Sequence, residues 1–177
     1  IEMVIAVFII LFGVNFNLYY YMLIRKFSLA YKNEELRTYL GIIATATLLI
    51  GLNVMKLYDN FGEALRHSFF MTASTITSTG FATVDTASWP VFSQTLMLLL
   101  MFVGACAGST GGGMKVSRII ILVKTGFREL KYIVNPRAVT TVKMDGKPVE
   151  RDVIRGVTSY FILFMMMFSI SDRKSVV

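Results

Sequence analysis

The chain has 177 residues, of which 55% are hydrophobic and 16% charged, with a net charge of +7 and a mean hydropathy of +0.63. In soluble domains about a quarter of all residues are charged, so this composition excludes an ordinary soluble domain and indicates a membrane protein. The single cysteine, Cys106, excludes a disulfide within the chain and a metal cluster built from cysteines.

The first two uncharged stretches, residues 3–24 and 38–55, have the length and composition of membrane spans. A helix needs roughly 20 mostly apolar residues to cross the hydrocarbon core. We therefore expect a transmembrane helix over residues 1–25 that exits to the cytoplasm at Arg25, and a second span that returns across the membrane. Because the chain is already in a span by Val4, we expect it to begin inside a longer protein.

The third uncharged stretch, residues 67–84, does not resemble a lipid-facing helix. Six of the eight residues from 72 to 79 are serine or threonine, and Gly80 follows them. A short helix over about 62–74 that dips into the membrane, followed by an extended return segment, fits this composition better. Non-helical backbone is tolerated at that depth only where protein shields it or where it lines a water-filled path.

The fourth stretch predicts a helix over residues 92–123 that is interrupted in the middle. As one ideal helix it would be on the order of 48 Å long, which exceeds one straight span. Consecutive glycines each cost roughly 1 kcal/mol relative to alanine in a helix. We expect an unwound loop of small residues, with its glycines at Gly104, Gly108, Gly111, Gly112 and Gly113. The run resembles a phosphate-binding loop, but Met114 separates the glycines from Lys115 and Val116 replaces the magnesium-binding hydroxyl. Nucleotide binding is therefore rejected.

The remaining sequence predicts a cytoplasmic loop over residues 124–152, the start of another transmembrane helix over 153–171, and a terminal tail over 172–177. The loop contains Asp145-Gly146, which favours a small β-hairpin. Charged residues begin again at Asp172, where an apolar span should continue. We therefore interpret 172–177 as a non-native tail and exclude it from the reasoning.

Basic residues gather between the expected spans and set the topology. Ten lie between Lys115 and Arg155, and four more lie in residues 25–37, whereas residues 56–94 hold Lys56 and Arg66 alone. This asymmetry is typical of cytoplasmic loops in membrane proteins. It accounts for the net positive charge, so no nucleic-acid partner is expected. Lys115 itself has two interpretations, an interfacial anchor or an electrostatic barrier at the cytoplasmic side of a pore.

Residues Thr77, Ser78, Thr79 and Gly80 have the chemistry expected of a cation filter. Backbone carbonyls replace the water shell of a cation without adding net charge, and compact hydroxyl side chains brace the turn that presents them. Gly80 can adopt backbone dihedrals that are closed to other residues. The alternative is that these hydroxyl residues pack one helix against another. The re-entrant topology and the broken helix that follows favour the filter.

Two motifs resemble the Trk/Ktr potassium uptake family of TrkH-type membrane subunits. They are TITSTGFATVD at residues 75–85 and GACAGSTGGGMK at residues 104–115. The resemblance implies an all-α integral membrane fold, with helix–re-entrant pore loop–helix repeats like those of potassium channels. Residues 38–123 would form one complete repeat with its filter at 77–81, residues 1–25 the closing helix of the preceding repeat, and residues 153–171 the opening helix of the next.

The resemblance also implies roles and partners. Potassium, the transported ion, would be bound at Ser78 and Thr79 with Thr77 and Gly80 adjoining, and the loop from Gly104 through Gly113 to Lys115 would be an intramembrane gate. It implies a homodimer in the bacterial plasma (inner) membrane, crossing the lipid bilayer several times and bound to a cytoplasmic nucleotide-binding ring resembling TrkA and KtrA. Three of the four filter segments lie outside this chain, so we do not expect the fragment alone to form a pore.

Two other function classes are open on the sequence alone. An ion-coupled secondary transporter of another solute also uses broken helices, but it usually places a charged residue at the midplane, and none is evident here. A membrane enzyme is disfavoured because no paired carboxylates, Ser/His/Asp or Cys/His arrangement suits hydrolysis. We therefore expect neither an enzyme nor a bound cofactor other than the transported ion.

Overall fold

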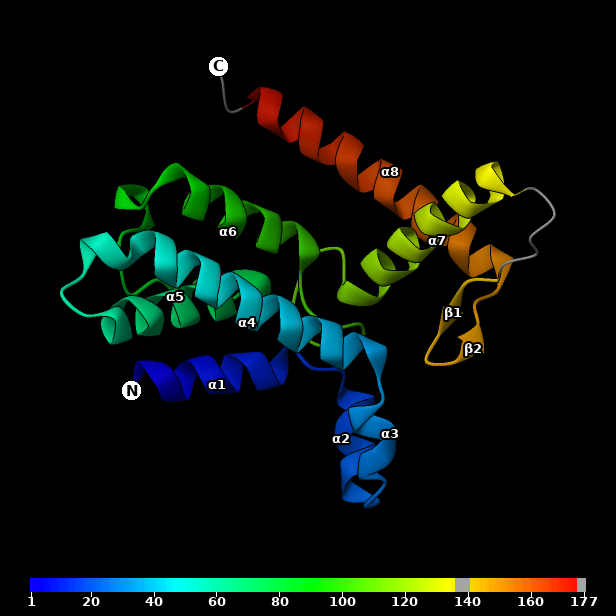
Figure 1. Ribbon diagram of the computed structural model, residues 1–177, viewed down its shortest axis with the longest axis horizontal. Helices are drawn as coiled ribbons and strands as arrows, with labels where there is room; N and C mark the ends of the chain where they lie inside the picture. The colour runs from blue at the N-terminus through cyan, green and yellow to red at the C-terminus, as the bar shows by residue number, and fades with distance from the viewer. Residues whose placement is uncertain (136–140, 175–177) are drawn as a thin grey trace. The chain divides into compact units, whose positions relative to one another are not determined.

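Figure 1 shows the computed structural model, which describes residues 1–135 and 141–174. The chain divides into two compact units, Ile1–Val116 and Ser117–Val177. Each unit has its own apolar core.

The first unit is a group of helices around α5 (Phe61–Ile76), which packs against α1 (Glu2–Phe12), α4 (Glu34–Val54) and α6 (Val91–Val103). Figure 1 shows α1, α4, α5 and α6 side by side. Shorter elements connect them: α2 (Phe16–Leu23), α3 (Phe27–Tyr31), and the 3₁₀ turns η1 (Met55–Leu57) and η2 (Thr86–Ser88). The helix α5 is therefore central, and this comparatively polar helix is surrounded by three more apolar helices.

Side chains at the helix starts explain several of these boundaries. Asn15 accepts a hydrogen bond from the backbone N–H of Asn17 at 2.9 Å, and Asn33 accepts one from Leu36 at 2.8 Å. Such N-caps satisfy backbone donors that the first turn of a helix leaves unpaired. The starts of α2 and α4 are thus fixed locally by asparagine.

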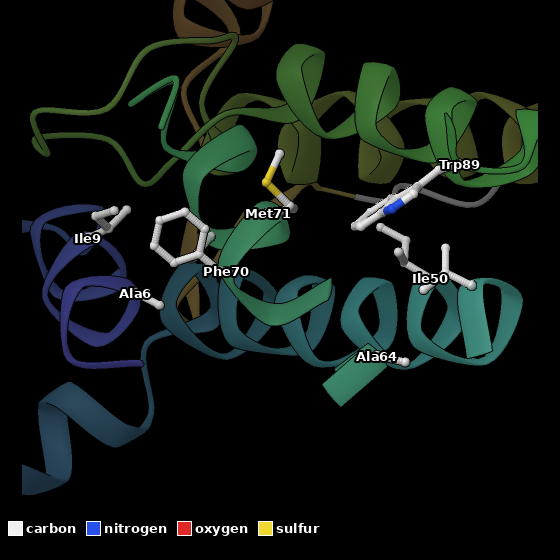
Figure 2. Packing of buried hydrophobic residues seen from close by; sticks show 9 residues of the cluster. Ala6, Ile9, Ile50, Ala64, Phe70, Met71 and Trp89 are labelled. Atoms are coloured by element: carbon white, nitrogen blue, oxygen red, sulfur yellow. The ribbon is translucent and has the colours of Figure 1, made fainter. Parts of the chain in front are cut away.

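The core of the first unit joins residues that are distant in the sequence. Figure 2 shows Phe70 of α5 beside Ala6 and Ile9 of α1, with Ile50 of α4 nearer to Trp89. The Trp89 indole donates to the Tyr58 hydroxyl at 3.3 Å. Large apolar side chains also remain exposed on the outside, which is the pattern of a lipid-facing surface. They include Leu40, Leu48, Leu52, Leu98 and Leu99.

Within the described residues, two helices, Glu34–Leu57 and Arg151–Ile170, are long and apolar enough to cross a membrane. The helix pair α1 and α2 passes the same test together but is bent by 92°. The predicted single helix over residues 1–25 is therefore wrong. The bend arises because Gly13 ends α1 while Asn15 caps the start of α2, so two local signals interrupt the apolar run.

The apolar stretch 92–123 is not one helix in the structure. α6 ends at Val103, and α7 (Val116–Val134) begins after a non-helical segment of glycines. The helix α7 continues to Val134, eleven residues past the predicted helix end at residue 123. Just past residue 123, Lys124 Nζ donates to the carbonyl of Lys143 at 2.7 Å.

The second unit contains α7, a two-stranded hairpin and α8 (Arg151–Lys174). The strands β1 (Lys143–Met144) and β2 (Lys147–Pro148) are antiparallel, and both turn residues between them, Asp145 and Gly146, have positive φ. The unit's core consists of Ile121, Val142, Ile154 and Val157. Of the predicted tail, residues 172–174 continue α8, while 175–177 lie outside the described residues.

Candidate ion site

The helix α5 ends in a Schellman motif. The N–H of Thr79 donates to Ser74 at 2.9 Å and the N–H of Ser78 donates to Thr75 at 3.1 Å. This motif requires a left-handed residue, usually glycine, and here Ser78 adopts it with a φ of 57°. A side chain in that conformation is strained, and such strain concentrates at functional sites.

Side-chain hydroxyl groups form hydrogen bonds along residues 73–81, at the end of α5 and in the turn after it. Thr77 Oγ1 donates to the carbonyl of Ala73 at 2.7 Å and lies 2.8 Å from Thr79 Oγ1. Ser74 Oγ donates to the carbonyl of Phe81 at 2.6 Å. Ser74 was not among the predicted site residues, although its place in the serine- and threonine-rich run was a signal for it. The predicted filter is thus braced from its own helix.

Three of the predicted filter residues line a cavity of about 490 Å³. Thr77, Ser78 and Thr79 lie on one side of it, Thr110 of the glycine-rich segment contributes another polar group, and Phe81 continues the wall beyond Gly80. Gly80 itself has a φ of 79° and is not part of the lining. The rest of the lining is apolar and comes from α1. The structure therefore brings three of the four predicted filter residues to one space.

The segment from Gly104 to Lys115, here called the glycine-rich loop, doubles back on itself. Val116 N donates to Ala105 O at 3.0 Å and Met114 N donates to Phe102 O at 3.0 Å. Gly104 and Gly113 cross so closely that a Cβ on Gly104 would lie 2.3 Å from the carbonyl oxygen of Gly112. Both glycines have positive φ. A side chain at either position would therefore be disfavoured both by the close contact and by the backbone conformation.

The glycine-rich loop lies directly against the turn at residues 77–79 that follows α5, here called the filter turn after its predicted role. A Cβ added to Gly112 would be 2.9 Å from Ser78 Oγ, and one on Gly111 would be 3.3 Å from the carbonyl oxygen of Thr77. The Lys115 ammonium donates to the carbonyl of Gly111, so this lysine folds back onto the loop. The structure thus groups the predicted gate residues with the predicted filter residues.

The glycine-rich loop is also bonded to the break between α1 and α2. Cys106 N donates to Gly13 O at 3.0 Å, Phe16 N donates to Gly108 O at 3.2 Å, and Thr110 Oγ1 donates to Phe12 O at 3.3 Å. These contacts were not foreseen from the sequence. Glycine followed two residues later by asparagine inside an apolar run was the available signal.

A carboxylate from α4 reaches the same loop. Glu35 Oε1 accepts a hydrogen bond from the backbone N–H of Ala107 at 2.6 Å. The side chain of Glu35 is buried, at 3% exposure. Sequence reasoning missed this residue because two consecutive acids at a helix start are common and carry no sign of a distant contact.

Comparison with known proteins identifies the family to which this arrangement belongs. The protein-family model TrkH, described as a cation transport protein, matches residues 1–174. The chain belongs to the TrkH family. The resemblance inferred from the motifs at residues 75–85 and 104–115 is thereby confirmed.

Several relatives in the TrkH family are similar over nearly the whole chain. The Trk system potassium uptake protein TrkH of Salmonella typhimurium is 34% identical over 174 residues, covering 97% of this chain and 36% of the relative. The Trk system potassium uptake protein TrkG of Escherichia coli is 37% identical over 169 residues, covering 94% of this chain and 35% of the relative. The chain thus spans just over a third of the length of these TrkH-family proteins.

The fold agrees with a solved TrkH structure. The crystal structure of the potassium transporter TrkH from Vibrio parahaemolyticus superposes with a TM-score of 0.86 at 34% identity. The match covers 96% of this chain and 37% of that one. The helical membrane architecture expected from the sequence is therefore that of the TrkH family.

Proposed function

We propose that the intact protein carries potassium ions across the bacterial inner membrane, through a filter to which this chain contributes Thr77, Ser78, Thr79 and Gly80. The observation that carries the proposal is the strained turn after α5, where hydroxyl groups brace the backbone beside a cavity. Potassium would be coordinated at Ser78 and Thr79 by carbonyl oxygens. The potassium uptake proteins among the relatives support the choice of ion.

The proposed architecture is one helix–pore loop–helix repeat over residues 38–123, with α5 as a re-entrant pore helix. The polar end of α5 supports this, because its partially negative C-terminus is favourable for a cation. Residues 1–25 would close the preceding repeat and residues 153–171 would open the next. The other filter segments would come from parts of the protein outside this chain, and the whole would be a multi-pass homodimer.

The glycine-rich loop is proposed as the gate of this pathway. Gly111 and Gly112 pack tightly against Thr77 and Ser78, because an added Cβ would lie 3.3 Å from the Thr77 carbonyl oxygen and 2.9 Å from Ser78 Oγ. A loop of small residues in that place would obstruct an ion leaving the filter and would still be able to move aside. Lys115, bonded to the loop, would add an electrostatic barrier at its cytoplasmic end.

Growth rescue tests the proposed function. The full-length gene, expressed in a bacterial strain without potassium uptake systems, should restore growth at low potassium, and the rescue should disappear in a variant that removes Thr77–Gly80. Sodium or a neutral solute should not substitute for potassium. Rescue that survived removal of these four residues would contradict the filter, and uptake of a different solute would favour a secondary transporter.

The second unit is proposed to contact a cytoplasmic nucleotide-binding ring. Its hairpin is too small to be stable alone, because two-stranded hairpins are marginal in water. Lys143 and Lys147 flank the hairpin turn and are exposed, as expected for an encounter surface for an acidic partner. Lys131 of α7 adds a further exposed charge, while Arg137, also predicted to contribute, lies outside the described residues.

Charge reversal at the hairpin tests the ring contact. Lys143→Glu combined with Lys147→Glu should weaken binding of the ring by about tenfold at low salt, since an exposed ion pair contributes about 0.2–1 kcal/mol. The loss should shrink at high salt because screening removes it. Titration of the ring against the full-length protein measures this, with Lys26→Glu combined with Lys32→Glu as the control. Equal binding by variant and parent at low salt would leave the hairpin without this role.

A further inference from the structure

Glu35 is a buried carboxylate in the first turn of α4, where neither the helix N-cap nor the helix dipole requires one. It is 3% exposed, and carboxylates are almost never fully buried unless they are paired. The side chain of Asn33 already caps α4 through the N–H of Leu36. Glu34, the preceding residue, is an acid in the same first turn and is only half-buried. A favourable interaction with the helix dipole would therefore be available without burying Glu35.

A partner of Glu35 lies 72 residues away in the glycine-rich loop. Its Oε1 accepts from the N–H of Ala107 at 2.6 Å, which is a short, charge-assisted hydrogen bond. Ala107 follows Ala105 and Cys106, both fully buried, so the bond is made where the chain leaves the buried part of the loop. A bond at this point fixes the end of the loop that leads to Gly108.

The other contacts of the loop differ from this one in kind. Those to Phe12, Gly13 and Phe16 are made between neutral groups. The Lys115 ammonium is charged, but it binds Gly111 from within the loop and moves with it. Glu35 is charged and stands on a different element, the long helix α4, which packs against α5. It can therefore act as a fixed point for the loop.

We propose that Glu35 is a positioning residue whose carboxylate holds the glycine-rich loop in its resting place against the filter turn. The proposal deepens the gate function proposed above and rests on it. Loss of the carboxylate frees the Ala107 amide, so the loop leaves its place more often. Glu35 does not touch the ion, so the choice between potassium and sodium stays unchanged.

Cys106 supplies a direct readout of loop position, because it adjoins Ala107 and is fully buried. The full-length protein is prepared with any other cysteines replaced by serine and reconstituted in lipid vesicles. The rate of Cys106 modification by a small water-soluble methanethiosulfonate and the potassium flux are then measured for Glu35→Ala, Glu35→Gln and the control Glu34→Ala.

Glu35→Ala should raise both the modification rate and the resting flux by about tenfold or more, because a hydrogen bond to a charged group has that weight in an equilibrium. Glu35→Gln keeps the shape and an acceptor but not the charge, so its effect should be smaller and in the same direction. Glu34→Ala should behave as the parent, and the potassium-to-sodium ratio should be constant throughout. If Glu35→Ala does not fold, the comparison of Glu35→Gln with Glu34→Ala decides.

The outcomes separate this proposal from the gate on which it rests. Parental modification and flux in both Glu35 variants would overturn the role of Glu35, and the gate would still stand if a shortened loop raised flux. Faster modification with unchanged flux would overturn the proposal as stated, because the loop would have moved without opening a path. If the shortened loop also left flux unchanged, the gate itself would fall.

Discussion

Replacing Gly80 with serine is expected to lower the potassium-to-sodium selectivity of the intact protein by about tenfold while membrane insertion stays normal. Gly80 has a φ of 79°, and a Cβ there would meet nothing within 4 Å. The cost is therefore conformational, about 1–2 kcal/mol for a side chain in the left-handed region. A tenfold change corresponds to about 1.4 kcal/mol. Relaxing the strain would rotate the neighbouring carbonyls away from the ion.

Ion flux in vesicles under potassium and sodium gradients measures this selectivity. Gly146→Ser is a matched control, because Gly146 has a φ of 77°, equally open surroundings and a place in the hairpin rather than the filter. The control should carry the same backbone strain and keep the parental ion preference. Unchanged selectivity in correctly inserted Gly80→Ser would remove Gly80 from the filter.

Deleting Gly111 and Gly112 is expected to raise resting potassium flux by at least about tenfold. These residues lie against the carbonyl of Thr77 and the hydroxyl of Ser78, so the deletion takes away the part of the loop nearest the filter. It also removes the carbonyl that Lys115 binds, and with it the position of that charge. Both changes remove an obstacle from the proposed potassium pathway.

The flux measurement needs a variant that disturbs the loop less. Gly112→Ala places a methyl group 2.9 Å from Ser78 Oγ and should push the loop away from the filter turn, with a smaller rise in flux. Gly41→Ala adds the same methyl group on α4 where nothing lies within 4 Å, and should leave flux unchanged. A deletion variant that inserts normally but shows equal or lower flux would show that the loop is not a gate.

Features determined by adjacent residues were accessible from the sequence. The end of α5 was placed within two residues of Ile76, because a run of hydroxyl residues before Gly80 favours a turn. The start of α4 fell four residues earlier than expected, where Asn33 provides a cap. The family was recognisable from its motifs, and the comparison with TrkH proteins confirmed it.

Features that depend on distant partners were not accessible. The bend at Gly13 was read as part of one helix because its neighbours are apolar enough to continue it. The backbone groups exposed by the bend bond to Cys106 and Gly108, about ninety residues later in the chain. Glu35 likewise gains its significance only from Ala107. Periodicity and capping signals describe neighbours along the chain, so they contain no information on such pairs.

The mutual bonding of the two breaks has a consequence for how the chain is assembled during synthesis. Gly13 offers its carbonyl to Cys106, and Phe16 offers its amide to Gly108. In hydrocarbon, an unsatisfied backbone group costs several kcal/mol. A nascent chain that has not yet reached residue 104 lacks both partners, so the straight helix is the lower-energy form of its first apolar segment. We therefore expect the 92° bend to form late, after the residues of the second break have been synthesised.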